Sequence, residues 1–413
     1  MLTRINDTGA RLIRRLLPQG ADNSIVPIFA ARALRGFADG FVAVLLPVYL
    51  LALGLGGVAV GAIATATLLG SAFATLAVGA WGHRCQGKVL LTGAAILMAA
   101  TGLGFSVAAT FWPLLLFAFV GTINPSSGDV SVFLPLEHAR LAAASDLANR
   151  TDLFARYALT GAMCAALGAL ASGLPDHLVI LLGVGRLDAL RGMFILYGIL
   201  GILVWALYQK LPVDEASSLA KPAPLGQSRA VVVRLAALFA VDSFAGGLVV
   251  NSLLALWMFQ RFGLSLSEAG TFFFGSGLLG AVSQLAAPRL ATRIGLVNTM
   301  VFTHIPASLC LIASAFSTDV RLALGLLLAR ALVSSMDVPA RSAFVMSVVQ
   351  VHERSAAASF TAVPRSLASA ASPLLAGWLF QSGWTVAPLV ACGVLKIAYD
   401  LALWRAFRLS ETN

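Results

Sequence analysis

Four aspartates lie inside stretches of the chain that are otherwise almost entirely apolar: Asp39, Asp129, Asp242 and Asp337. A carboxyl group in such surroundings can bind a proton, bind a solute, or form an ion pair with an arginine. Arg35 precedes Asp39 by four residues, and Arg341 follows Asp337 by four in the segment "SMDVPARS". On a helix this spacing places both members of a pair on one face. The four carboxyl groups are therefore candidates for a site that binds protons or a solute.

The composition predicts that these residues lie in a membrane. Of 413 residues, 59% are hydrophobic and 11% are charged, and the mean hydropathy is +0.89. A soluble globular protein carries roughly a quarter charged residues. The four cysteines have neither the spacing of a disulfide framework nor that of a metal cluster. We expect an all-α membrane protein without a metal or another cofactor.

The apolar segments fit the length of a membrane-spanning helix, which is about 20 residues. About twelve candidates follow one another: 27–52, 58–81, 88–110, 113–136, 150–173, 189–210, 232–258, 266–287, 297–317, 321–345, 355–380 and 384–406. The longest polar stretch, 211–229, lies near the middle of the chain. We therefore expect an N-terminal segment 1–25, a six-helix bundle 26–210, a linker 211–229, a second bundle 230–408 and a tail 409–413.

The net charge of +10 is explained by the two sides of the membrane. If the N-terminus is cytoplasmic, most lysines and arginines fall on the cytoplasmic side, as the positive-inside rule requires. This bias predicts cytoplasmic termini and a cytoplasmic linker in a multi-pass protein of the cell inner membrane. It also removes any need for a nucleic-acid partner.

An aspartate at the centre of a spanning helix costs about 2.5–3.5 kcal/mol on insertion scales, so the four are expected to be paired or solvated. Three interpretations of the Asp–Arg pairs stay open: a permanent clamp, a gate that breaks and reforms, or a direct binding site. A gate would close Asp337 and Arg341 on each other, or on charges near Asp129 and Glu137. Pro339 is expected to loosen the helix between Asp337 and Arg341.

Other ionisable residues inside the spans receive weaker assignments. We expect Arg330 and Arg365 to serve a pathway, and Arg156 to form a gate or clamp with Asp152. His304 is expected to serve packing, and Lys396 and Asp400 to form an interfacial pair. Gly36 and Gly40 form a G-x-x-x-G motif, which is typical of closely packed membrane helices.

An internal repeat relates the two halves of the chain. "SGDV" at 127–130 matches "SMDV" at 335–338, and residues 149–173 align without gaps to residues 353–377. Gly54, Gly61 and Arg84 align with Gly263, Gly270 and Arg293 at a constant offset of 209. The order of these matches indicates two pseudo-symmetric six-helix bundles.

With its twelve spans, central linker and repeat, the chain resembles the major facilitator superfamily from about residue 26 to 406. That family carries a basic signature between helices 2 and 3 of each half. Here the corresponding segments are "GAWGHRCQGK" at 79–88 and "PRLATRIG" at 288–295, with Arg84, Lys88 and Arg293 at the basic positions. His83 and Thr292 stand where the family usually has an acid.

The resemblance implies a secondary transporter that works by alternating access, with its site near the bilayer midplane. The sequence carries neither a nucleotide-binding domain nor the motif of a hydrolytic enzyme, so we expect no enzymatic activity. Carboxyl groups in the pathway favour coupling to protons. We expect a monomeric, proton-coupled exporter of a small toxic or amphipathic compound. Two alternatives stay open: a small-anion carrier that uses Arg330, Arg365 and Arg35, and a non-transporting membrane scaffold.

Overall fold

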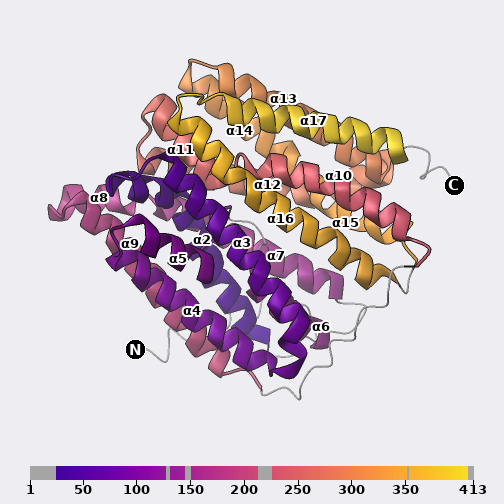
Figure 1. Cartoon of the computed structure of the whole chain (residues 1–413), viewed down its shortest axis with the longest axis horizontal. Helices are drawn as coiled ribbons and strands as arrows, with labels where there is room; N and C mark the ends of the chain where they lie inside the picture. The colour runs from indigo at the N-terminus through magenta and orange to yellow at the C-terminus, as the bar shows by residue number, and fades with distance from the viewer. Residues whose placement is uncertain (1–24, 127–130, 145–149, 213–225, 351–352, 408–413) are drawn as a thin grey trace.

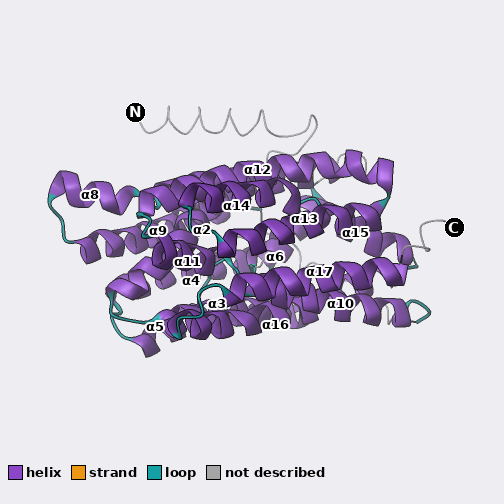
Figure 2. Cartoon of the chain, turned by 90° about the horizontal axis from the view of Figure 1, so that it is seen from above, coloured by secondary structure: helices purple, strands orange, loops and turns teal. Residues whose placement is uncertain are grey.

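The computed structural model describes residues 25–126, 131–144, 150–212, 226–350 and 353–407, and these residues form helices and no strand (Figure 2). In a bilayer a helix satisfies its own backbone hydrogen bonds, which explains why the apolar segments adopt it. Residues 1–24, most of the linker and the whole tail 409–413 lie outside the described residues.

Among the described residues, eight α-helices build the first half. They are α2 (Val26–Ala52), α3 (Gly57–Trp81), α4 (Gly87–Val107), α5 (Phe111–Val120), α6 (Phe133–Ala143), α7 (Arg150–Ala171), α8 (Leu174–Leu182) and α9 (Arg186–Gln209). Eight more build the second half. They are α10 (Arg229–Gly247), α11 (Asn251–Phe262), α12 (Leu266–Ile294), α13 (Leu296–Phe316), α14 (Val320–Ser334), α15 (Asp337–Val348), α16 (Arg354–Gln381) and α17 (Ala387–Phe407).

These helices agree with the expected spans. Ten helical segments of the described chain are long and apolar enough to cross a membrane. The two remaining regions are α16, which carries two arginines, and the region of α5 and α6, which is interrupted. The expectation of an all-α protein with about twelve spanning regions in two bundles is thus confirmed.

Three spans expected to be continuous are interrupted. Helix α5 ends at Val120 and α6 begins at Phe133, α10 and α11 are separated at 248–250, and α14 and α15 at Ser335–Met336. The last break corrects the expected role of Pro339, because the helix is interrupted one turn before it. A proline ring clashes with the carbonyl four residues upstream, which is that of Ser335. Pro339 itself lies in the first turn of α15, where its missing N–H breaks no helical bond.

The repeat is visible in matched glycines. Gly54 and Gly263 follow the ends of α2 and α11, and both have a positive φ, of 79° and 65°. Only glycine adopts this conformation without a steric cost. Gly61 of α3 contacts α16 of the other half, and Gly270 of α12 contacts α7. The matched glycines therefore lie at the two places where a helix of one half closely approaches a helix of the other half.

The two halves pack through α3 against α16 and through α7 against α12 (Figure 1). We call the end of the molecule where α2 begins and α17 ends the terminal end, and the other the opposite end. At the opposite end Gln381 Oε1 accepts a hydrogen bond from the backbone N–H of Val58 at 2.9 Å. Asp176 Oδ2 likewise accepts one from Ser267 N–H at 3.3 Å. These bonds join the halves at the opposite end.

Helix contacts within the first half also use glycines. A side chain at Gly36 would overlap the carbonyl oxygen of Gly161, and one at Gly40 would overlap that of Ala165. Small residues at this spacing let α2 lie directly against the backbone of α7. The interpretation of the G-x-x-x-G motif as a packing device is confirmed.

Candidate functional site

Six ionisable side chains of the second half form a continuous chain of contacts, which we call the C-terminal network: Asp337, Arg341, Asp242, Lys396, His304 and Asp400. Arg341 donates to Asp337 and, at 2.9 Å, to Asp242 Oδ2. Lys396 Nζ donates to Asp242 Oδ1 at 2.6 Å. The network joins four spanning regions through three acidic and three basic side chains.

The far end of the C-terminal network consists of His304 and Asp400. His304 Nε2 lies 3.4 Å from Lys396 Nζ, and His304 Nδ1 lies 3.2 Å from Asp400 Oδ1. The expectation that His304 serves packing alone is therefore wrong. Lys396 and Asp400 do not form the expected pair of their own, because Lys396 bonds to Asp242 and Asp400 bonds to His304.

The helices explain why these groups meet. Asp337 begins α15 just after the break, where a carboxylate is stabilised by the helix dipole. Arg341 lies one turn further along the same face. Lys396 and Asp400 are one turn apart on α17, so both face α13 and α10. The sequence spacing predicts the Asp337–Arg341 contact, whereas Asp242 and Lys396 are brought in by the packing of helices.

Burial places the C-terminal network inside the second bundle. The side chains of Asp242, Asp337, Arg341 and Lys396 are 5%, 6%, 9% and 12% exposed, respectively. Removing one partner of a buried ion pair typically costs 3–5 kcal/mol, because the remaining charge is left without compensation. Loss of any one of these charges therefore leaves its partner without compensation inside the bundle.

The first half has a buried cluster of its own around Glu137, which we call the N-terminal cluster. Glu137 accepts hydrogen bonds from Arg35, from the hydroxyl of Tyr157 and, at 2.7 Å, from that of Tyr208. The Arg35 guanidinium also lies 4.1 Å from the centre of the Phe133 ring. The Glu137 side chain is completely buried, and three donors satisfy it.

Two features of the N-terminal cluster differ from the expectation. Arg35 pairs with Glu137, not only with its neighbour Asp39, which lies close enough to interact with Arg35 and Tyr197 electrostatically. Tyr157 and Tyr208 were not singled out, although a buried tyrosine hydroxyl needs a partner. In this structure Arg341 and Glu137 each pair within their own half, so the expected ion pair across the interface is not formed by these two residues.

Two further arginines of the second half have no acidic partner in the described part of the chain. Arg365 on α16 is half-buried, and its Nε donates to Ser243 Oγ at 3.3 Å. Its guanidinium also lies 6.0 Å from the centre of the Phe239 ring. Arg330 on α14 is half-buried near Cys310 and Cys392. Neither guanidinium therefore has a directly bonded counter-charge among the described residues.

The remaining expected site residues lie at the surface or outside the described chain. Arg156 bonds to Asp152 at 2.9 Å, with the two side chains 38% and 51% exposed. Arg84 and Arg293 are exposed at the terminal end. Lys88 donates to the carbonyl oxygens of Gln209 and Leu211 and so caps the end of α9. Asp129 lies outside the described residues.

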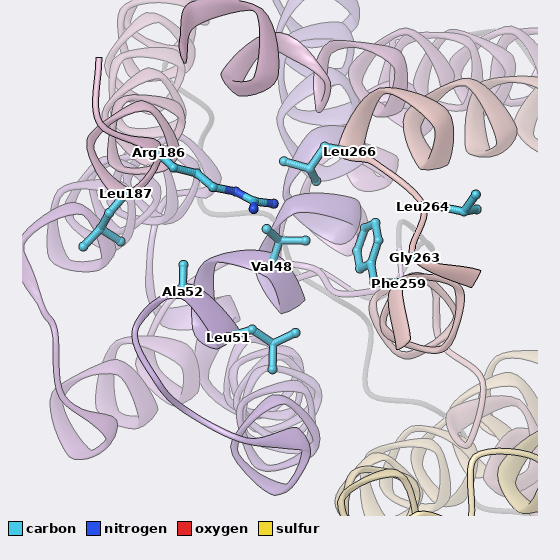
Figure 3. A pocket seen from close by; sticks show the side chains of 9 residues that line it. All are labelled: Val48, Leu51, Ala52, Arg186, Leu187, Phe259, Gly263, Leu264 and Leu266. Atoms are coloured by element: carbon cyan, nitrogen blue, oxygen red, sulfur yellow. The ribbon is translucent and has the colours of Figure 1, made fainter. Parts of the chain in front are cut away.

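A cavity of about 580 Å³ lies at the opposite end of the molecule, between the ends of α2, α9, α11 and α12 (Figure 3). Its walls are apolar apart from Arg186, whose guanidinium reaches into it between Val48 and Leu266. The sequence did not identify this cavity, because its walls come from four separate helix ends. Such a cavity suits an amphipathic anion, whose charged end would pair with Arg186 and whose apolar part would contact the walls.

Comparison with known proteins agrees with this architecture. The family model of the Major Facilitator Superfamily matches residues 28–328 and 235–412. An uncharacterized membrane protein of Saccharomyces cerevisiae is 24% identical over 423 residues, which cover 93% of this chain and 94% of the yeast protein.

Solved structures share the fold at low sequence identity. A POT family transporter in complex with a thioalcohol-conjugated peptide has a TM-score of 0.72 at 14% identity, covering 97% of this chain and 99% of that one. The nucleoside transporter NupG has a TM-score of 0.70 at 14% identity, covering 94% and 98%. A bacterial homologue of the human lysosomal transporter Spinster, in an inward-facing and occupied conformation, has a TM-score of 0.69 at 14% identity, covering 94% and 96%. This chain is therefore a multi-pass membrane protein that belongs to the Major Facilitator Superfamily.

Proposed function

We propose that this protein is a secondary transporter that works by alternating access and exports a small amphipathic compound in exchange for protons. The observation that carries this proposal is the position of the C-terminal network beside the break between α14 and α15. Transporters typically place substrate and coupling-ion sites at discontinuous helices near the bilayer midplane. Charged residues at this depth also mark transport pathways more often than structural contacts.

The broken helices of the two halves meet, which supports a site between them. The backbone N–H of Ser252, at the start of α11, donates to the carbonyl oxygen of Pro125 at 3.1 Å. Pro125 lies in the break between α5 and α6. Backbone groups released by a break are tolerated at membrane depth where they are buried in protein or line a water-filled cavity.

In this proposal the two bundles, 26–210 and 230–408, move as units joined by the linker 211–229. Hydrogen bonds between the halves at the opposite end correspond to a state closed towards the outside of the cell. Both termini then lie in the cytoplasm, and the exposed Arg84 and Arg293 face it, as the positive-inside rule favours. The membrane is the cell inner membrane, and the working unit is a monomer.

Competition among the carboxylates for Arg341 supplies a route to proton coupling. Asp337 and Asp242 both bond to Arg341, and Asp242 also bonds to Lys396. A proton on either aspartate weakens its hold on the shared cation, so the other aspartate takes it over. Asp39 and Asp129 are assigned the corresponding role in the first half, with Arg35 held by Glu137. Arg156 is assigned a gate at the terminal end.

Purified protein in liposomes with an acidic interior tests the exchange. A panel of amphipathic toxic compounds is added outside, and a trapped pH-sensitive dye reports the loss of internal protons. Some compounds are expected to raise the internal pH faster than in protein-free liposomes and in liposomes that carry the Asp242→Asn variant. Equal rates in all three preparations for every compound would contradict proton-coupled export and leave a scaffold as the better interpretation.

A second candidate, a carrier of small anions, is favoured by Arg365 and Arg330, which have no acidic partner among the described residues. In liposomes loaded with an unlabelled carboxylate or with phosphate, counterflow of the labelled anion would indicate this activity. Replacing Arg365 by glutamine should abolish counterflow, whereas replacing the exposed Arg261, which has no assigned role, should not. Absence of counterflow with both anions would exclude this candidate for these two substrates.

A further inference from the structure

The end of the C-terminal network that is farthest from Asp337 along its contacts consists of His304 on α13 and Asp400 on α17. His304 and Asp400 have side chains that are 6% and 0% exposed. Asp400 Oδ1 contacts His304 Nδ1, but Asp400 Oδ2 is buried and has no hydrogen-bond partner among the residues that the structure describes. A buried carboxylate oxygen without a donor is costly, because it has lost its water and gained nothing. This unpartnered oxygen therefore requires an explanation.

The neighbouring groups fix where the hydrogens are. Lys396 is an ammonium and can only donate, so His304 Nε2, which lies 3.4 Å away, must accept. The imidazole hydrogen is then on Nδ1, which donates to Asp400 Oδ1 at 3.2 Å. In this arrangement His304 is neutral and Asp400 is ionised, and Asp400 Oδ2 is the oxygen of this pair that has no donor among the described residues. A further proton can bind at Oδ2 without breaking any of these contacts.

The charges that surround this pair come from every helix that packs on it. Helix α17 itself supplies Lys396, Cys392 and the buried Tyr399 hydroxyl. Helix α10 supplies Asp242, and α15 supplies Asp337 and Arg341. Helices α14 and α16 supply Arg330 and Arg365, respectively. The ionisable residues of α12 are Glu268, Arg289 and Arg293, towards its two ends. Asp242 and Asp337 are held by Arg341 and Lys396, whereas the hydrogen-bonding contact of Asp400 within the described chain is with the neutral His304. Asp400 is therefore the acid of the network that has no cation of its own.

We propose that the transported proton binds at Asp400 Oδ2, supported by His304, and that Lys396 transmits its arrival to Asp242. This proposal rests on the proton-coupled function proposed above. Binding adds one proton to the carboxylate and gives a neutral carboxylic acid, and release restores the carboxylate. An ionised Asp400 attracts Lys396 only at a distance, across His304, and protonation of Asp400 removes this attraction while the hydrogen bond of Lys396 to Asp242 remains. The changed attraction between Lys396 and Asp242 then alters the hydrogen bond of Asp242 to Arg341, which lies beside the break between α14 and α15.

The proton can be observed without knowing the substrate. In pH-difference infrared spectra of the purified protein, a protonated buried carboxyl group gives a C=O stretching band that an ionised one lacks. The wild-type protein is expected to gain this band on acidification, and the Asp400→Asn variant is expected to lack it. Asp188→Asn serves as the matched control, because the Asp188 side chain is 68% exposed and lies outside the network.

Two variants of His304 keep the proposal testable if Asp400→Asn folds poorly. His304→Leu removes the donor to Asp400, so the band should appear at a higher pH than in the wild type. His304→Asn can keep a donor to Asp400 but loses the contact with Lys396. The Asp400 band should therefore remain, but protonation of Asp400 should no longer be coupled to that of Asp242. An unchanged band in Asp400→Asn, or an unchanged midpoint in His304→Leu, would overturn the proposal. Failure of the liposome assay with a normal band would instead count against the transport function alone.

Discussion

The N-terminal cluster yields a quantitative prediction about stability. Replacing Glu137 by alanine removes the acceptor of three buried donors and leaves Arg35, whose side chain is 4% exposed, without its counter-charge. Loss of one partner of a buried ion pair typically costs about 3–5 kcal/mol. The hydroxyl groups of Tyr157 and Tyr208 lose their acceptor as well, and each such loss costs about 1–3 kcal/mol. Glu137→Ala should therefore be among the most destabilising single changes in the chain.

Two milder variants calibrate this loss. Tyr208→Phe removes one hydrogen bond to a charged acceptor and should cost about 1.5–3 kcal/mol. Asp152→Ala breaks a pair whose side chains are 38% and 51% exposed, and it should cost less than about 1 kcal/mol. The expected order of destabilisation is Glu137→Ala, then Tyr208→Phe, then Asp152→Ala.

Thermal unfolding in detergent measures this order. In a background in which Cys85, Cys164 and Cys310 are replaced by serine, a thiol-reactive fluorophore reports unfolding through Cys392, which is completely buried in the folded protein. The double variant Arg35→Met with Glu137→Leu removes both charges and should unfold at a higher temperature than Glu137→Ala. A Glu137→Ala midpoint no lower than that of Asp152→Ala would refute the claim that this cluster stabilises the first bundle.

Three further predictions follow from the geometry. Asp337→Asn and Asp39→Asn should remove most of the proton-driven exchange in liposomes while the protein remains folded by size-exclusion chromatography, and full exchange in both would leave these aspartates as structural residues. A side chain at Gly61 would overlap the carbonyl oxygen of Pro373, so Gly61→Val should separate α3 from α16 at the opposite end, whereas Gly79→Ala, which meets open space, should not; spin-label distances across the two helices distinguish these outcomes. In intact cells an impermeant maleimide should label a cysteine introduced at Val184 but not the native Cys85, since the two lie at opposite ends, and equal labelling would contradict the topology.

Composition, hydropathy and the repeat predicted the helical fold, because membrane burial of about 20 residues leaves little choice of structure. The constant offset of 209 also identified glycines that have the same structural role in both halves, at helix ends and at contacts between the halves. The breaks in the helices were harder to predict, although local signals exist. Gly246 and Gly247 precede the break after α10 and have low helix propensity. Pro339 marks the break at Ser335–Met336, one turn upstream.

The ionisable groups were found from the sequence, but their partners were not. Spacing along one helix predicted the contact of Arg341 with Asp337. Glu137 is 102 residues from Arg35, and Lys396 is 154 residues from Asp242, so only the packing of the helices brings each pair together. The same reason explains His304, whose surroundings are set by α17. A charged residue inside a spanning segment can be recognised from the sequence, but the residue that pairs with it cannot.

The central claim is that the two halves expose opposite ends in turn under the control of protons. Double electron–electron resonance tests it directly with one label pair at Gln86 and Thr292, at the terminal end, and another at Val184 and Trp384, at the opposite end. When the pH is lowered from about 8 to about 5, a range in which buried carboxyl groups can titrate, the distance of one pair should increase while that of the other decreases. Distances that stay unchanged in both pairs, or that change in the same direction, would contradict proton-controlled alternating access.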